Sequence, residues 1–314
     1  MPAIEASGLS KTFVTGRRAR RREVEAVKGI SFSVAEGERL AYIGPNGAGK
    51  STSIKMLTGI LHPTSGSAQV LGYTPWTERR SLVRHIGTLF GQRSQLWFQL
   101  TPRQTFELLG TMYGLRRDAA DARIQELGKI LEATDLFDVP VRSLSLGQRM
   151  RCELAATMLH SPRVLFLDEP TIGLDLLAKQ RFRDVIVRLN EDLGTTVFLT
   201  SHDVSDIEQV ARRVIVINHG TIIYDDSVST MRRSLLNTKL LEVRFEDDPG
   251  PIVIDGVTVL KQRGAGYKLS VDTEKHSIRE VLDELLDRYQ VADISVLDPP
   301  LEEIIGNIYE APQT

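Results

Sequence analysis

The sequence has almost no cysteine, no long apolar run and no marked excess of one charge. Cys152 is the single cysteine among 314 residues, which excludes a disulfide within the chain and any CxxC-based zinc or redox motif. The apolar stretches are short, such as 164–167 and 214–217, far below the roughly 18–20 residues that span a bilayer. The 39 basic and 41 acidic residues argue against a dedicated nucleic-acid binder. These absences predict a soluble protein of a reducing, cytoplasmic compartment.

The order of apolar segments predicts a mainly parallel sheet with helices on both faces. Strand-like and helical segments alternate along much of the chain, and this alternation is typical of an α/β fold. The expected strands are 3–13, 26–34, 37–43, 164–168, 196–200 and 213–217, and the expected helices are 51–61, 177–193 and 204–211. A mostly helical insert at about 93–160 interrupts the sheet, with a helix start at Thr101-Pro102, an N-cap followed by proline.

The pattern changes after about residue 235, where short strands are separated by tight turns. The expected strands are 241–245, 257–261, 267–271 and 293–297, and the expected helices are 277–289 and about 301–309. We therefore predict two domains, one over 1–235 and a small α+β domain over 236–314, in line with about 100–200 residues per domain.

A glycine-rich loop at 44–52 carries the strongest chemical signal. Its sequence, GPNGAGKST, fits the pattern G-x-x-x-x-G-K-[ST] of phosphate-binding loops and lies between a predicted strand and a predicted helix. Glycines allow the backbone N–H groups to wrap around a polyphosphate, and the helix adds its positive end. Lys50 can reach the β- and γ-phosphates, and the Ser51 hydroxyl can bind Mg²⁺. The expected nucleotide contacts are Gly44, Pro45, Asn46, Gly47, Ala48, Gly49, Lys50, Ser51 and Thr52.

Two acidic residues follow a predicted apolar strand and support the phosphate loop. Asp168 and Glu169 come directly after 164–167, at a strand end where open α/β sheets bind ligands. The turn into Pro170 can bring both carboxylates to one site. Asp168 is the expected Mg²⁺ residue, and Glu169 is the expected general base for the water that attacks the γ-phosphate.

Six motifs in order make residues 3–230 resemble the nucleotide-binding subunit of an ABC transporter. After the phosphate loop, Gln92 follows a predicted strand as in the Q-loop, and LSLGQ at 144–148 resembles the LSGGQ signature. Asp168 and Glu169 end the Walker B motif, 173–175 resembles the D-loop, and His202 matches the switch histidine. The resemblance implies a P-loop NTPase fold with a RecA-like sheet, and it implies ATP and Mg²⁺ as ligands.

The resemblance also implies that two ATP molecules are held between two such subunits. Ser145 and Gly147 of one subunit, with Gln148 beside them, would contact the γ-phosphate bound by Lys50 of the other. Phe13 lies where the family places an aromatic ring on adenine, a role that suits a flat apolar face, and a core residue of the first strand is the alternative.

Further roles follow from the same resemblance. Gln92 would sense the γ-phosphate, His202 would position it with the attacking water, and Asp175 would communicate across the dimer. The expected catalytic residues are Lys50, Gln92, Glu169 and His202, and the expected metal-binding residues are Ser51, Gln92 and Asp168. Leu146 stands where the signature usually has glycine, so we expect a competent site with altered packing.

Three other features allow more than one interpretation. The arginine cluster at 17–22 is interpreted as a solvated or lipid-proximal loop, with contact to a nucleic acid or the nucleotide as the alternative. Leu96-Trp97-Phe98 either forms a groove for a membrane partner or is buried in the helical insert. Cys152, beside Leu154 on a predicted helix, is interpreted as a structural thiol.

Together these observations predict an ATPase subunit that drives an integral-membrane permease made by a separate chain. It would act as a homodimer or heterodimer of such subunits, peripheral on the cytoplasmic face of the membrane, with no nucleic-acid partner. The tail domain, with FGQRSQLW and LSLGQRMR, resembles the daunorubicin-resistance exporter type and favours export. The alternative is an ABC ATPase of translation, chromosome maintenance or repair, although a single cassette, a short insert and one cysteine argue against these types.

Overall fold

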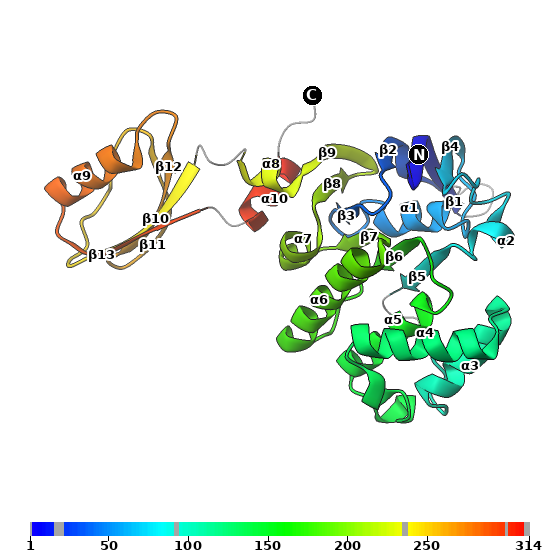
Figure 1. Ribbon diagram of the computed structural model, residues 1–314. Coiled ribbons are helices and arrows are strands. Elements are labelled where there is room, and N and C mark those ends of the chain that lie inside the picture. The colour runs from blue at the N-terminus through cyan, green and yellow to red at the C-terminus, as the bar shows by residue number, and fades with distance from the viewer. Residues whose placement is uncertain (1, 16–21, 91–93, 234–237, 299–300, 311–314) are drawn as a thin grey trace. The chain divides into compact units, whose positions relative to one another are not determined.

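The computed structural model describes residues 2–15, 22–90, 94–233, 238–298 and 301–310. They form two compact units, which divide between Asp226 and Ser227 (Figure 1). This division lies nine residues before the boundary expected at 235, because helix α8 (Val228–Arg233) contacts α10 (Leu301–Glu310) near the end of the chain. The short segment after the cassette therefore belongs with the second unit.

A six-stranded sheet forms the centre of the first unit, in the order β5-β6-β7-β3-β8-β9. The first five strands in this order are parallel, as the sequence predicts. Their bounds are Ile86–Phe90 (β5), Val164–Asp168 (β6), Thr196–Ser201 (β7), Arg39–Ile43 (β3), Arg213–Asn218 (β8) and Thr221–Ser227 (β9). Every residue of β3 and β7 is buried, as is usual for parallel strands with both faces covered.

Successive residues of β6 enter different hydrophobic clusters on the two faces of this sheet. Leu165 and Leu167 pack in a cluster with α5 (Leu146–Met158) and α6 (Leu176–Leu193), whereas Val164 and Phe166 pack with α1 (Lys50–Leu57). Helix α1 ends earlier than the 61 expected from the sequence, because Gly59 takes a left-handed φ of 71° just after it. The short helices α2 (Arg79–Leu82) and α7 (Val204–Val210) complete this part of the unit.

An antiparallel sheet of three strands, β2-β1-β4, contacts helix α1. Its strands are β1 (Ile4–Thr15), β2 (Arg22–Val34) and β4 (Ser65–Val70). Strand β4 is not among the strands expected from the sequence. Its polar sequence, SGSAQV, gives little strand signal, and its partner is β1 at the start of the chain, where Ile4 lies opposite Val70.

The helical insert lies between β5 and β6. It comprises α3 (Pro102–Tyr113), α4 (Arg117–Ile130), two short 3₁₀ turns at Thr134–Leu136 and Val141–Ser143, and α5. Thr101 caps α3 as predicted, and Gln104 completes the capping box. Cys152 is fully buried on α5, where burial raises the pKa of its thiol to about 12, in agreement with a structural role. Among the described residues, no helix is both long and apolar enough to cross a membrane.

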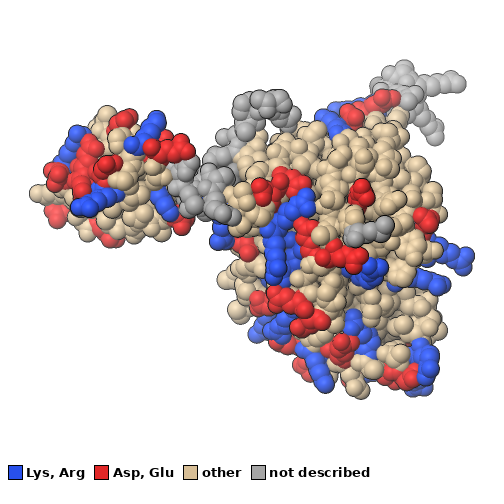
Figure 2. Space-filling model, turned by 45° about the horizontal axis from the view of Figure 1, so that its top comes forward, with Lys and Arg blue, Asp and Glu red and all other residues tan. Residues whose placement is uncertain are grey.

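The second unit contains a four-stranded antiparallel sheet, β11-β12-β10-β13, with α9 packed on one face. The bounds are Thr238–Phe245 (β10), Val257–Arg263 (β11), Gly266–Asp272 (β12), Ile278–Arg288 (α9) and Val291–Leu297 (β13). Over the face shown in Figure 2, acidic and basic side chains are interspersed rather than gathered by sign, as their near-equal numbers suggest.

Candidate functional site

The glycine-rich loop joins the buried strand β3 to helix α1, and the surrounding backbone admits only glycine at two of its positions. A Cβ on Gly44 would lie 2.2 Å from the Ile217 carbonyl oxygen, and one on Gly49 would lie 2.5 Å from the Ala26 oxygen. Gly49 also has a φ of 110°, which side chains rarely allow. The loop is thus held against β2 and β8, with the first N–H groups of α1 directed to the space that it encloses.

A Gly49→Ala substitution should lower both the stability of the cassette and its affinity for ATP. The left-handed backbone costs about 1–3 kcal/mol for a residue with a Cβ, and the clash with Ala26 adds to that cost. Gly72→Ala is the matched control, because Gly72 has a φ of 82° but no atom within 4 Å of the added Cβ. Denaturant unfolding and titration with a fluorescent ATP analogue measure both effects. Equal losses in the two variants would contradict the packing argument.

Lys50, the first residue of α1, is buried inside this loop. Its Nζ donates to the Gly44 oxygen at 2.5 Å and to the Pro45 oxygen at 3.3 Å. It also lies 3.4 Å from Glu169 Oε1. The ammonium group is therefore placed where it can exchange these oxygens for those of a bound polyphosphate.

The two acidic residues meet the loop at the carboxyl end of β6. Asp168 Oδ1 accepts a hydrogen bond from Ser51 Oγ at 3.2 Å and another from Thr200 Oγ1 at 2.7 Å. Hydroxyl and carboxylate oxygens of this kind are ligands that Mg²⁺ accepts. Thr200 is a site residue that the sequence analysis does not predict. Its position near the end of β7, the strand next to β6 in the sheet, is the feature that could have indicated its contact with Asp168.

Glu169 has the left-handed φ of 53° that the turn after β6 requires. Its backbone N–H donates to the oxygen and the Oγ1 of Thr200, both at 3.1 Å, and these bonds stabilise the strained residue. Its carboxylate then lies between Lys50 and His202, whose Nδ1 is 2.7 Å from Oε2. The turn thus brings both acidic side chains to the phosphate loop.

The Ser51 hydroxyl and the Asp168 carboxylate fit a Mg²⁺ ion that binds together with a nucleotide rather than a metal ion held by the protein alone. Among the residues described, no three His, Cys, Asp or Glu side chains gather into a metal site. Mg²⁺ is usually held by one or two protein oxygens, with phosphate oxygens and water completing the shell. Ser51 and Asp168 are the pair that would hold it.

The signature segment lies at the start of α5. The exposed Ser145 is the N-cap of this helix, and Gln148 completes a capping box with it. A Cβ on Gly147 would lie 2.7 Å from the Ala178 Cβ, so this glycine is required for close packing on α6.

Leu146 and Asp175 both lie at the D-loop. The Leu146 Cδ2 atom lies 3.3 Å from the position that a Cβ on Gly173 would take, so the extra bulk of this leucine lies beside the D-loop. Asp175 caps α6 by accepting the Ala178 N–H at 2.9 Å.

The remaining predicted contacts are only partly placed. Phe13 is half-buried on β1, opposite Val24, with Lys11 Nζ at 5.4 Å from its ring centroid. Gln92 lies outside the described residues, as do positions 17–21 of the arginine cluster. Stacking of Phe13 on adenine and the role of Gln92 stay predictions.

Comparison with known proteins places this geometry in a family. Residues 27–172 match the family described as ABC transporter. The daunorubicin/doxorubicin resistance ATP-binding protein DrrA of Streptomyces peucetius is 36% identical over 310 residues, which cover 96% of this chain and 91% of that protein. The ABC transporter ATP-binding protein NatA of Bacillus subtilis (strain 168) is 31% identical over 215 residues, or 68% of this chain and 87% of NatA.

Two solved structures are similar to about three quarters of the chain. One is a dimeric, post-hydrolysis state of the ATP-binding cassette MJ0796 bound to ADP and Pi, with 25% identity, a TM-score of 0.63, and coverage of 72% of this chain and 98% of that one. The other is CbiO1 of Clostridium perfringens, part of the ABC transporter complex CbiONQ, with 26% identity, a TM-score of 0.65, and coverage of 74% and 94%. The phosphate loop, the paired carboxylates and these similarities agree: the chain belongs to the ATP-binding subunits of ABC transporters, and it hydrolyses ATP.

Proposed function

We propose that two cassettes close on ATP, each supplying its phosphate loop to one nucleotide and its Ser145 to the other, and thereby drive an exporting permease. The observation that carries this proposal is the row of apolar side chains around the signature and the D-loop. Ile172, Leu176, Leu177 and Leu146 are exposed although they are large and apolar. Exposed apolar residues gathered near a site are typical of a surface that a partner covers.

The geometry suggests a separate role for each of the catalytic residues Lys50, Glu169 and His202. Mg²⁺, when bound, neutralises part of the phosphate charge. Lys50 would turn from Glu169 and the loop oxygens to the phosphates, which frees Glu169 Oε1 to accept a proton from water. His202 would keep the other oxygen, Oε2, in place through its 2.7 Å contact. His202 then holds one carboxylate oxygen of Glu169, and the other oxygen is free to accept the proton.

The contact with the permease is proposed at the start of the helical insert. Leu96 is buried in the insert, whereas Trp97 and Phe98 are 47% and 49% exposed. Leu96 thus fits the interpretation that this segment is buried in the insert, and Trp97 and Phe98 fit the interpretation that it contacts a membrane partner. Half-exposed aromatic side chains are common anchors of protein interfaces, so Trp97 and Phe98 are suited to receive a segment of the membrane partner.

Export is proposed from the relatives. DrrA is a daunorubicin/doxorubicin resistance protein, and LnrL of Bacillus subtilis, 35% identical over 197 residues, is a linearmycin resistance protein. An ATP-driven transporter that removes a toxic compound from the cell confers resistance to it, so outward transport fits both names. We place this chain on the cytoplasmic face of the membrane, where ATP is available.

The ATPase rate tests the shared site. Because each site needs two chains, hydrolysis per molecule should rise with chain concentration, and Ser145→Ala should suppress it at every concentration. A rate per molecule that is independent of concentration would contradict the proposal.

The permease contact predicts a separate effect of the aromatic pair. Replacing Trp97 and Phe98 together by alanine should weaken co-purification with the co-expressed permease and reduce transport, while the isolated chain keeps its ATPase rate. Met112→Ala is the control, because Met112 is exposed on α3 of the same insert. Unchanged co-purification of the double variant would place the contact elsewhere.

A further inference from the structure

One face of helix α5 contacts the segment that carries the aromatic pair. Ser145, Arg149, Glu153 and Thr157 are spaced by four residues, so they lie in one row along the helix. Ser145 is at the exposed start of this row, and the other three contact residues 94–98. The signature serine and the aromatic segment are therefore joined by a single line of side chains.

Glu153 makes the central contact of this row. The Ser94 hydroxyl donates to its Oε1, and the Gln95 N–H donates to its Oε2 at 2.9 Å. Glu153 is only 2% exposed. Burial raises the pKa of its carboxyl group, while these hydrogen bonds act in the opposite direction. A polar group buried to this degree is costly to leave without partners, so segment and helix are expected to move together.

Contacts on both sides of Glu153 extend the attachment. The Gln95 side-chain amide donates to Thr157 Oγ1 at 2.9 Å, one turn further along α5. In the other direction, the Arg149 guanidinium lies 5.4 Å from the centroid of the Phe98 ring. The Arg142 N–H donates to the Phe98 oxygen at 3.2 Å, just before the signature. The segment is thus fixed to α5 and to the turn that precedes it.

We propose that Glu153 is a positioning residue that couples the signature serine to the aromatic pair Trp97 and Phe98. When Ser145 engages the nucleotide of the partner, the displacement of α5 would pass through Glu153 to the surface that contacts the permease. This inference rests on the proposed function, because it uses the shared ATP site and the proposed permease contact. It adds the residue that links the two.

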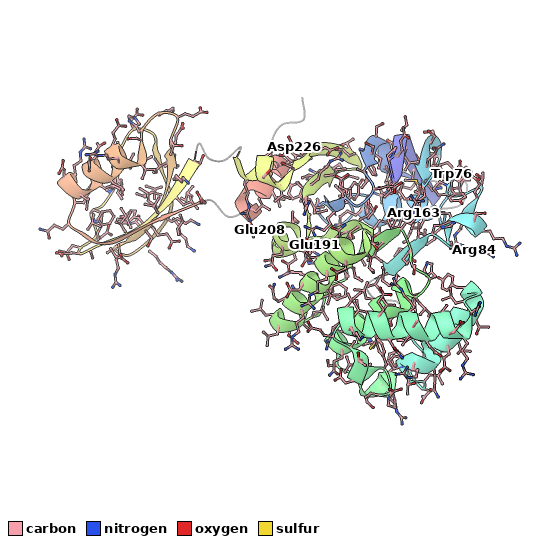
Figure 3. The ribbon with its side chains drawn as sticks, viewed as in Figure 1. Trp76, Arg84, Arg163, Glu191, Glu208 and Asp226 are labelled. Carbon is pink, nitrogen blue, oxygen red and sulfur yellow. The ribbon has the colours of Figure 1, made fainter. Side chains whose placement is uncertain are left out.

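Fluorescence of Trp97 in the isolated full chain tests this coupling. The chain has two tryptophans, and the other, Trp76, lies beside α2 (Figure 3), with its ring centroid 5.4 Å from that of His62 and tilted by 49° against it. In a Trp76→Phe, Glu169→Gln background, Mg·ATP should produce the closed dimer and change the Trp97 emission. Adding Glu153→Ala should abolish the emission change while the dimer still forms, as measured by light scattering.

Two further variants separate coupling from stability. Glu153→Gln should retain the emission change, because an amide can accept the Gln95 N–H and donate to Ser94 Oγ, whose hydrogen is then directed to the Leu96 oxygen at 3.1 Å. Ile124→Ala removes a buried side chain of α4 in the same insert and should also retain it. The proposal is overturned if Glu153→Ala keeps the full emission change, or if Ile124→Ala loses it equally.

The same experiment distinguishes a failure of the proposed coupling from a failure of the proposed function. A parent chain that binds Mg·ATP but forms no dimer contradicts the proposed function, and the coupling with it. A parent chain that dimerises without any change at Trp97 contradicts the coupling alone.

Discussion

Glu169→Gln should lower the rate of ATP hydrolysis by about 10²–10⁴-fold, the usual contribution of a general base, while ATP binding persists. Glutamine keeps the shape of the side chain but cannot take a proton from water. The Lys50 and His202 contacts identify this carboxylate as the one held at the phosphate loop. Phosphate release and nucleotide affinity are the two measurements.

The matched control is Glu107→Gln, on an exposed position of α3 in the helical insert. It makes the same chemical change away from the site and should leave hydrolysis unaltered. If Glu169→Gln hydrolysed ATP at the parent rate, another group would have to be the base, and the assignment would be wrong.

Asp206→Ala should cost the cassette about 3–5 kcal/mol of its free energy of unfolding, because it leaves a charge buried without its main partner. Asp206 accepts hydrogen bonds of 2.6 Å from Arg183, Thr171 and Ser201. The side chains of Asp206 and Arg183 are 1% and 3% exposed. Such a loss is a large fraction of the roughly 5–15 kcal/mol that stabilises a typical domain.

Asp206 also supports the site, since Thr171 follows the Glu169 turn and Ser201 precedes His202. Hydrolysis should therefore fall with stability. The control is Glu132→Ala, which breaks a surface ion pair with Arg188 and should cost no more than about 1 kcal/mol. Denaturant unfolding of the three chains gives both values. An equal loss of unfolding free energy in the two variants would contradict the stabilising role of the buried hydrogen bonds around Asp206.

Much of the fold and of the site could be predicted, because both depend on local patterns. The alternation of apolar strands and helices predicted the parallel sheet, and the similar solved structures confirm that fold class. The phosphate loop was visible because its glycines, Lys50 and Ser51 lie within a few residues of one another. The order of the motifs identified the family, which the similarity to DrrA confirms.

What the sequence did not reveal depends on contacts between distant residues. Strand β4 exists because it pairs with β1, more than 50 residues away. Thr200 contacts Asp168 only because β6 and β7 are neighbours in the sheet. Glu153 and Ser94 are 59 residues apart, and neither carries a pattern that predicts their hydrogen bond.

The mass of the Glu169→Gln chain with Mg·ATP tests the shared site most directly. The chain has a mass of 35.1 kDa, and light scattering should report twice that mass when Mg·ATP is present. The dimer should disappear without nucleotide and when Ser145→Arg is added, because a bulky charged side chain cannot fit against the γ-phosphate site of the partner. A chain that binds Mg·ATP and stays at 35.1 kDa would contradict the shared site.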